Sequence, residues 1–110
     1  MKLEMKDKGR YMDGNTPRNV MFSVYPSGRE WKVSGFGMVR EPGLASWKYF
    51  TYPLSALQGI KTQRNHAIWL CLDFLAEGRT ETVCLPGLSN VSEVERTLRE
   101  YMADRDKPAS

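Results

Sequence analysis

The feature that most constrains this chain is a period of two in its apolar residues, which recurs along most of its length. Residues 20–25 alternate between the two faces of an extended chain, and residues 67–75 show the pattern most clearly. Because successive side chains of a strand point to opposite faces of a sheet, this period predicts β-strands. We expect six of them, over residues 20–25, 31–40, 47–52, 57–62, 67–75 and 80–85.

Turn residues between these segments predict hairpins. Pro26-Ser27-Gly28 joins the first two strands, since proline presets φ and glycine accepts a positive φ. Glu77-Gly78 is a two-residue connection between the last two strands. This loop sets the register of the final hairpin and predicts three facing pairs, which are Leu70 with Leu85, Cys71 with Cys84, and Leu72 with Val83.

Two glycines stand on one face of the second strand. Gly35 and Gly37 are two positions apart, so their missing side chains leave a gap on that face. Glycine inside a strand usually marks a bulge, a bend or the close approach of another element. We therefore expect a sharply curved strand that is crossed by packing from a helix or a sheet.

A different period follows Pro86-Gly87, where the strands stop. Apolar residues then recur every three or four positions, which predicts an amphipathic helix that ends near Ala103. Ser89, Asn90 and Ser92 all offer an N-terminal cap, and Glu93 lies three positions after Asn90. The apolar stripe of this helix consists of Val91, Val94, Leu98, Tyr101 and Met102.

These elements predict an α+β fold. Strands in hairpin order form an antiparallel sheet, which curls because each strand pair twists. The helix must bury its stripe, so we expect a curved sheet or partly open barrel of about six strands capped by one C-terminal amphipathic helix. Residues 20–104 are expected to form this single domain. Residues 1–19 are expected to be a flexible N-terminal arm, and the alternative is that this arm adds a short seventh strand. Residues 105–110 are expected to be a frayed C-terminal tail.

This order of elements resembles the pleckstrin-homology-like superfold, in particular its small bacterial versions. The resemblance rests on architecture: the strands over residues 20–85, the turn at Pro86-Gly87, and the helix around Val94, Leu98 and Tyr101. It implies a partly open barrel that acts as a binding module. The superfold usually has seven strands, one more than we expect here. The basic pattern that lipid-binding members use has no counterpart in residues 27–32, so phosphoinositide binding does not carry over.

Charge and hydropathy limit the compartments and the partners. No apolar run is long enough to cross a bilayer, and the N-terminus has no apolar stretch of the kind that a secretory signal needs. We therefore expect a cytoplasmic protein without a membrane span. Basic residues dominate positions 20–66 and acidic residues dominate positions 67–110, a separation that can steer an anionic partner to one side of the molecule.

Residues suited to catalysis or metal binding are few and scattered. His66 is the single histidine and lies in a polar turn, so the chain lacks the ligand set of a zinc site. Cys71 and Cys84 are expected to be buried reduced thiols, with a cross-strand disulfide as the alternative. Asp73 interrupts an apolar strand at a position where alternation lets it face solvent. We expect no enzyme, no catalytic residues, no cofactor and no metal site.

Aromatic and basic residues are interleaved on the second and third strands. This combination is typical of protein interfaces and also of sites for single-stranded nucleic acid. The leading hypothesis is a non-enzymatic binding or adaptor module that engages a protein partner, and the alternative is a small nucleic-acid-binding protein that uses the same basic half. A free sheet edge beside Pro53 would allow a homodimer. The expected partner-binding residues are Lys32, Arg40, Trp47, Lys48 and Tyr52.

Overall fold

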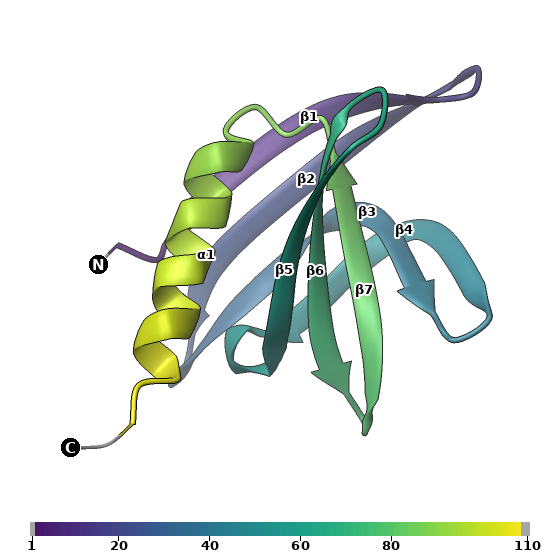
Figure 1. Cartoon of the computed structure of the whole chain (residues 1–110). Coiled ribbons are helices and arrows are strands. Elements are labelled where there is room, and N and C mark those ends of the chain that lie inside the picture. The colour runs from purple at the N-terminus through teal and green to yellow at the C-terminus, as the bar shows by residue number, and fades with distance from the viewer. Residues whose placement is uncertain (1, 109–110) are drawn as a thin grey trace.

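Residues 2–108 form an α+β fold of seven antiparallel strands, six of them in a half-barrel, with one C-terminal α-helix (Figure 1). The computed structural model describes residues 2–108. All six expected strands are present, and a further strand precedes them. The elements are β1 (Met5–Asp13), β2 (Thr16–Ser27), β3 (Glu30–Glu41), β4 (Leu44–Pro53), the short 3-10 helix η1 (Leu54–Ala56), β5 (Leu57–Arg64), β6 (Ile68–Ala76), β7 (Arg79–Pro86) and α1 (Val91–Arg105).

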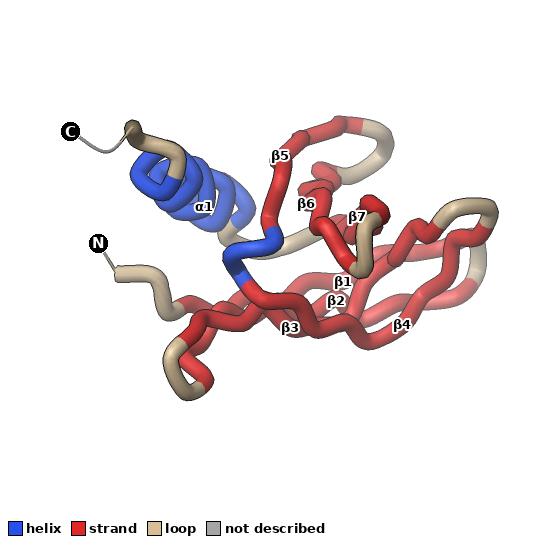
Figure 2. Tube along the Cα trace, turned by 90° about the horizontal axis from the view of Figure 1, so that it is seen from below, coloured by secondary structure: helices blue, strands red, loops and turns tan. Residues whose placement is uncertain are grey.

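The sheet branches at β3. The strand order is β1-β2-β3-β7-β6-β5, and β4 pairs with the other edge of β3. Two strands share one edge of β3. This edge pairs with β2 as far as Phe36 and with β7 from Met38 to Arg40. The sheet therefore divides into a layer of β1–β4 and a layer of β5–β7, which face each other in Figure 2.

The two glycines of β3 lie where the sheet branches. A Cβ atom on Gly35 would overlap the carbonyl oxygen of Met21 on β2. A Cβ atom on Gly37 would lie 2.8 Å from the side chain of Leu85 and 2.9 Å from the carbonyl oxygen of Cys84, both on β7. Real Cβ atoms do not approach other atoms so closely, so both positions need glycine for the close approach that the sequence predicted.

The last hairpin has the register that its two-residue turn predicts. Leu70 pairs with Leu85, Cys71 with Cys84, and Leu72 with Val83. Glu77 and Gly78 have φ angles of 51° and 79°, and the Asn-Gly or Asp-Gly type of hairpin turn likewise needs positive φ at both central positions. The predicted register of β6 and β7 is therefore confirmed.

One hydrophobic core fills the space between the two layers and the helix. Each strand from β2 to β7 contributes alternate residues, and α1 contributes Val94 and Leu98. The residues that are 2% exposed or less are dominated by branched aliphatic side chains and two phenylalanines, which suit a pleated surface. They are Val20, Phe22, Val24, Val33, Val39, Leu54, Leu57, Leu70, Leu72, Phe74, Val83, Cys84, Leu85 and Leu98.

Strand β1 occupies much of the segment for which we expected a flexible arm. It pairs along its whole length with β2, from Met5 opposite Val24 to Asp13 opposite Thr16. The alternation was hidden because two of its inward positions hold Asp7 and Gly9 instead of apolar residues. A Cβ atom on Gly9 would overlap the backbone of Gly87, so a larger apolar residue does not fit there.

The buried carboxylate of Asp7 joins β1 to the start of α1. Asp7 is 9% exposed. Its Oδ2 atom accepts a hydrogen bond of 2.8 Å from the backbone N–H of Asn90, and its Oδ1 atom accepts one of 2.8 Å from the N–H of Lys8. The N–H of Ser89 donates to the carbonyl of Lys8 at 3.1 Å. These bonds explain why a charged residue occupies an inward position of the strand.

Replacing Asp7 with alanine should lower the free energy of unfolding by about 2 kcal/mol, because two backbone donors lose a charged acceptor. Urea denaturation followed by tryptophan fluorescence measures the loss. Asp7→Asn keeps one acceptor oxygen and should lose less. Lys8→Ala, which removes an exposed side chain but keeps the backbone bonds, should stay near the wild type. An Asp7→Ala protein as stable as Lys8→Ala would contradict this role.

Helix α1 lies beside β5 and satisfies backbone acceptors at and near its edge. Arg99 Nη2 donates to the carbonyl of Ile60 at 3.2 Å, and Arg105 Nη1 donates to the carbonyl of Leu57 at 2.8 Å. Thr62 Oγ1 donates to Glu95 Oε2 at 2.9 Å. The two hydrogen-bonded groups, Thr62 and Arg99, hold the pKa of Glu95 below its ordinary value. The β5 edge is thereby covered by polar contacts with the helix.

The helix ends at Arg105, slightly beyond the predicted end. Of the tail expected over residues 105–110, positions 109–110 lie outside the described residues. Within residues 2–108, no helix combines the length and hydropathy needed to span a lipid bilayer.

Candidate functional site

The five residues predicted to bind a partner do not share one surface. The register of β3 and β4 places Lys32, Arg40 and Trp47 on one face of this strand pair. It places Lys48 and Tyr52 on the inner face, beside Gly37 and Val33. The five residues are therefore divided between the two faces of the β3–β4 pair.

Tyr52 is part of the core. It is 8% exposed, and its ring stacks on Phe74 with centroids 4.4 Å apart. Its hydroxyl donates to Glu81 Oε1 at 2.6 Å. Burial, followed by the neighbouring Glu81 carboxylate, raises the pKa of Tyr52 far above its ordinary value. Tyr52 therefore keeps its proton and its internal partner, and it is not available to an external one.

Contacts within the chain also engage three of the other four residues. Trp47 stacks on Tyr11 at 6.1 Å between ring centroids, and the guanidinium of Arg18 lies 5.3 Å from the centre of its ring. Lys48 forms an ion pair with Glu41, which holds the pKa of that carboxyl below its ordinary value. Lys32 lies 4.0 Å from Glu30. Arg40 is exposed, on the β3 segment that pairs with β7.

The structure instead brings together two rows of side chains on the outer face of β1–β4. Facing residues in neighbouring strands share a face, so the registers identify each row. The first row is Lys6, Ser23, Ser34 and Thr51. The second row is Lys8, Met21, Phe36 and Tyr49. The two rows contain two lysines and no carboxylate.

Hydroxyl groups in the first row are linked across three strands. Ser34 Oγ lies 3.1 Å from Thr51 Oγ1 and 2.9 Å from the hydroxyl of Tyr25. Ser23 Oγ donates to the carbonyl of Ser34 at 3.4 Å. The network holds these side chains in place, so they can exchange hydrogen bonds with a ligand without first being ordered.

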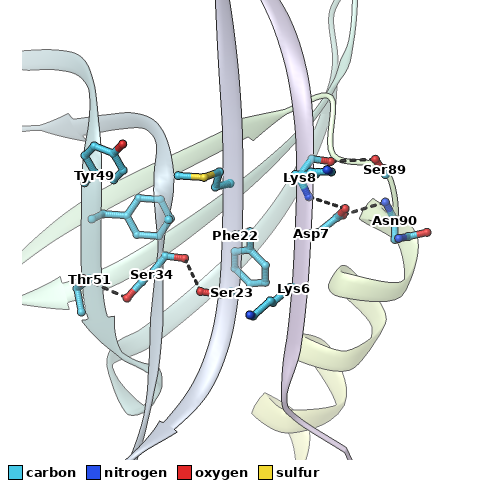
Figure 3. Close-up of a pocket in the computed structure, with 13 residues that line it drawn as sticks. Lys6, Asp7, Lys8, Phe22, Ser23, Ser34, Tyr49, Thr51, Ser89 and Asn90 are labelled. Carbon is cyan, nitrogen blue, oxygen red and sulfur yellow. Dashed lines mark hydrogen bonds between the residues drawn. The ribbon is translucent and has the colours of Figure 1, made fainter.

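An open groove of about 730 Å³ runs over this face (Figure 3). In the figure, Tyr49 and Thr51 on β4 lie on one side, and Lys6 and Lys8 on β1 lie on the other. Apolar parts of Met21, Phe22 and Phe50 line it between the two sides, and Ser89 and Asn90 close the β1 end. We call this hollow the β1–β4 groove.

The exposed aromatic ring of the β1–β4 groove belongs to Tyr49. Tyr49 is 73% exposed, and its ring meets the edge of Phe36 at a centroid distance of 4.9 Å. Met21, 42% exposed, is the next large apolar side chain on this face. A second hollow of about 330 Å³ adjoins the groove and shares Met21 and Tyr49 with it. The apolar part of a ligand would contact these residues, and its negative groups would meet the lysines.

The sequence analysis did not name Lys6, Lys8 or Tyr49 as partner-binding residues. Lys6 and Lys8 alternate with Asp7 and Gly9, a period-two pattern of charge that would have indicated an outward face had residues 5–13 been recognised as a strand. Alternation places Tyr49 on the same face as Trp47. Tyr49 is exposed and Trp47 is half-buried, and this difference depends on tertiary packing.

Comparison of the chain with protein-family models, with curated proteins and with solved structures found no match. Among residues 2–108, no three histidine, cysteine, aspartate or glutamate side chains gather in a way that would hold a metal ion. The shape and chemistry of the β1–β4 groove are therefore what indicates a function.

Proposed function

We propose that this chain is a non-enzymatic binding module, of the pleckstrin-homology-like type, that holds an acidic segment of a protein partner in the β1–β4 groove. The observation that carries the proposal is the pair of outward rows on β1–β4, which combine two lysines, linked hydroxyls and exposed apolar side chains, with no carboxylate in either row. Asp7 also lines the groove, but its carboxylate accepts hydrogen bonds from the backbone N–H groups of Lys8 and Asn90. A partner with complementary charge would be steered to this face and aligned on it.

The chemistry of the groove defines the segment that fits it. Lys6 and Lys8 stand side by side in the two rows and favour aspartate or glutamate at matching positions. The exposed side chains of Met21 and Tyr49 favour an apolar side chain next to those acids. Ser34 and Thr51 offer hydrogen bonds to a peptide backbone. An extended peptide with an apolar residue between acidic ones satisfies all three.

Single-stranded nucleic acid is the alternative ligand, and Tyr49 is the observation that favours it. A base can stack on an exposed aromatic ring while lysines neutralise phosphates. The β1–β4 groove supports a protein partner more strongly, because nucleic acid carries a charge on every nucleotide and two lysines would neutralise few of them.

The arrangement of strands supports the pleckstrin-homology-like type. β1 supplies a seventh strand, the number usual in that superfold and one more than the sequence predicted. Strands β1–β4 form one layer, β5–β7 form the other, and α1 follows them (Figures 1 and 2). A location in the cytoplasm remains a prediction. So does pairing of two copies along β4, where the inward-pointing Lys48 is a feature that discourages edge pairing.

Charge reversal in the β1–β4 groove tests the proposal. Peptides selected from a random display library on the wild-type protein should be rich in acidic residues flanking an apolar one. Lys6→Glu with Lys8→Glu should weaken binding of such a peptide by about tenfold or more, since attraction becomes repulsion. Fluorescence anisotropy with the labelled peptide measures the change.

A matched double variant separates local charge from net charge. Arg29→Glu with Arg64→Glu changes the net charge equally at exposed positions outside the groove, and it should keep near wild-type affinity. Equal weakening by both double variants would contradict the groove assignment. A single-stranded oligonucleotide that binds in place of any selected peptide, with affinity that falls steeply with salt, would make nucleic-acid binding the function.

A further inference from the structure

Two free thiols face each other in the β6–β7 hairpin, away from the β1–β4 groove. Cys71 and Cys84 are directly paired across the strands, and their Sγ atoms lie 2.9 Å apart. Cys84 is fully buried, whereas Cys71 is 7% exposed. A small reagent therefore reaches Cys71 first, and the second sulfur is already within contact of the first.

Cationic side chains flank the pair. Lys61 on β5 pairs directly with Cys71, on the same face of the sheet. Arg40 on β3 stands one row away, next to Thr82. The nearest carboxylate, Asp73, accepts a hydrogen bond of 2.6 Å from Thr82 Oγ1, which lies in the same row as Arg40. The positive field of Lys61 and Arg40 favours a thiolate over a thiol.

The two sulfur atoms are not equivalent. The hydrogen bond between the two sulfur atoms lowers the pKa of Cys71, and the charges of Arg40 and Lys61 add to this effect against the opposing effects of burial and of Asp73. The same contact, together with burial, raises the pKa of Cys84 far above its ordinary value. Cys71 thus has the character of the attacking sulfur, and Cys84 remains a proton-bearing partner beside it.

We propose that Cys71 and Cys84 form a thiol oxidation site, at which Cys71 is oxidised by hydrogen peroxide and Cys84 closes a reversible intramolecular disulfide. The geometry supports this pairing because the resolving sulfur already lies 2.9 Å from its target. Because the two residues face each other in neighbouring strands, Cys84 stays next to Cys71 before and after Cys71 is oxidised.

The reaction balances with peroxide as the only oxidant. Cys71 first loses its proton, and the resulting thiolate attacks one peroxide oxygen. The O–O bond breaks, and the departing hydroxide takes up the proton that Cys71 released and forms water, leaving a sulfenic acid on Cys71. The sulfur of Cys84 then attacks the Cys71 sulfur, a disulfide bond forms, and the hydroxyl group leaves with the Cys84 proton as a second water. The two thiols lose two electrons, which the peroxide gains.

Mass spectrometry of the intact full-length protein tests the site directly. Wild-type protein treated with hydrogen peroxide, then unfolded and exposed to iodoacetamide, should lose two hydrogen atoms and take up no alkyl group. Dithiothreitol should restore both alkylation sites. Peptide mapping of the exposed Met12 and Met21 gives an internal measure of the peroxide dose. Two alkylated cysteines after a dose that oxidises these methionines would overturn the proposal.

Single variants assign the two roles. In Cys84→Ala, dimedone present during oxidation should trap a sulfenic acid on Cys71. In Cys71→Ala, Cys84 should react with peroxide at least tenfold more slowly than Cys71 does in Cys84→Ala. Circular dichroism establishes that both variants keep the strand content of the wild type. A dimedone adduct on Cys84, or a disulfide that forms only between two molecules, would refute the assignment, and the wild-type experiment stands even if one variant does not fold.

Discussion

Replacing Gly35 with alanine is expected to lower the free energy of unfolding by about 3 kcal/mol, a large effect for one methyl group. The new Cβ atom would overlap the carbonyl oxygen of Met21 and come within 3.0 Å of Cζ of Phe50. Neither the paired backbone of β2 nor a buried ring can withdraw without disturbing its own contacts. The strain would act close to the point at which the pairing partner of β3 changes from β2 to β7. The whole half-barrel should therefore lose stability.

A second glycine provides the matched control for this prediction. Gly28 has φ of +65° in the turn between β2 and β3, and a Cβ atom there would meet open space. Gly28→Ala should therefore cost only about 1 kcal/mol, the price of a left-handed backbone for alanine. Urea denaturation of both variants measures the difference. Equal losses would mean that the close approach at Gly35 is relieved at little cost.

Truncating Leu98 to alanine is expected to lower the free energy of unfolding by about 3 kcal/mol, because it leaves a cavity between α1 and the sheet. Leu98 is fully buried and belongs to the one core that both layers share. Helical propensity cannot account for such a loss, since alanine is the best helix former. The change therefore isolates the packing of the helix from the formation of the helix.

The exposed face of the same helix offers the comparison. The side chain of Arg96 is 62% exposed and pairs with Glu100 at 3.3 Å. Arg96→Ala should change stability by less than about 0.5 kcal/mol, as surface substitutions usually do. Denaturation of the two variants under one condition measures the contrast. If Leu98→Ala were as mild as Arg96→Ala, α1 would not be packed on the sheet in solution.

The division of the predicted partner-binding residues between two faces follows from a pattern that is already visible in the chain. Strict alternation assigns Trp47 and Lys48 to opposite faces of β4, and the register confirms this. A surface that contained both was therefore inconsistent with the predicted strand. Tyr52 illustrates the same point, since its face holds Phe50 and belongs to the core.

Local information determined most of the elements. Six strands, the amphipathic helix and the register of the β6–β7 hairpin were predictable, because a period of two, a period near three and a half, and a two-residue turn are properties of neighbouring residues. The close approach at Gly35 and Gly37 was predictable for a related reason, since glycine inside a strand has few other uses.

The tertiary structure alone decided the rest. β1 is a strand because its inward Asp7 and Gly9 meet Asn90 and Gly87 from the far end of the chain, contacts that no local pattern contains. The division of β3 between β2 and β7 then sets which face of β1–β4 is open, and so places Lys6 and Lys8 on one groove with Tyr49. Which residues lie inside depends on alternation along each strand, but which surfaces meet depends on contacts between residues distant in sequence.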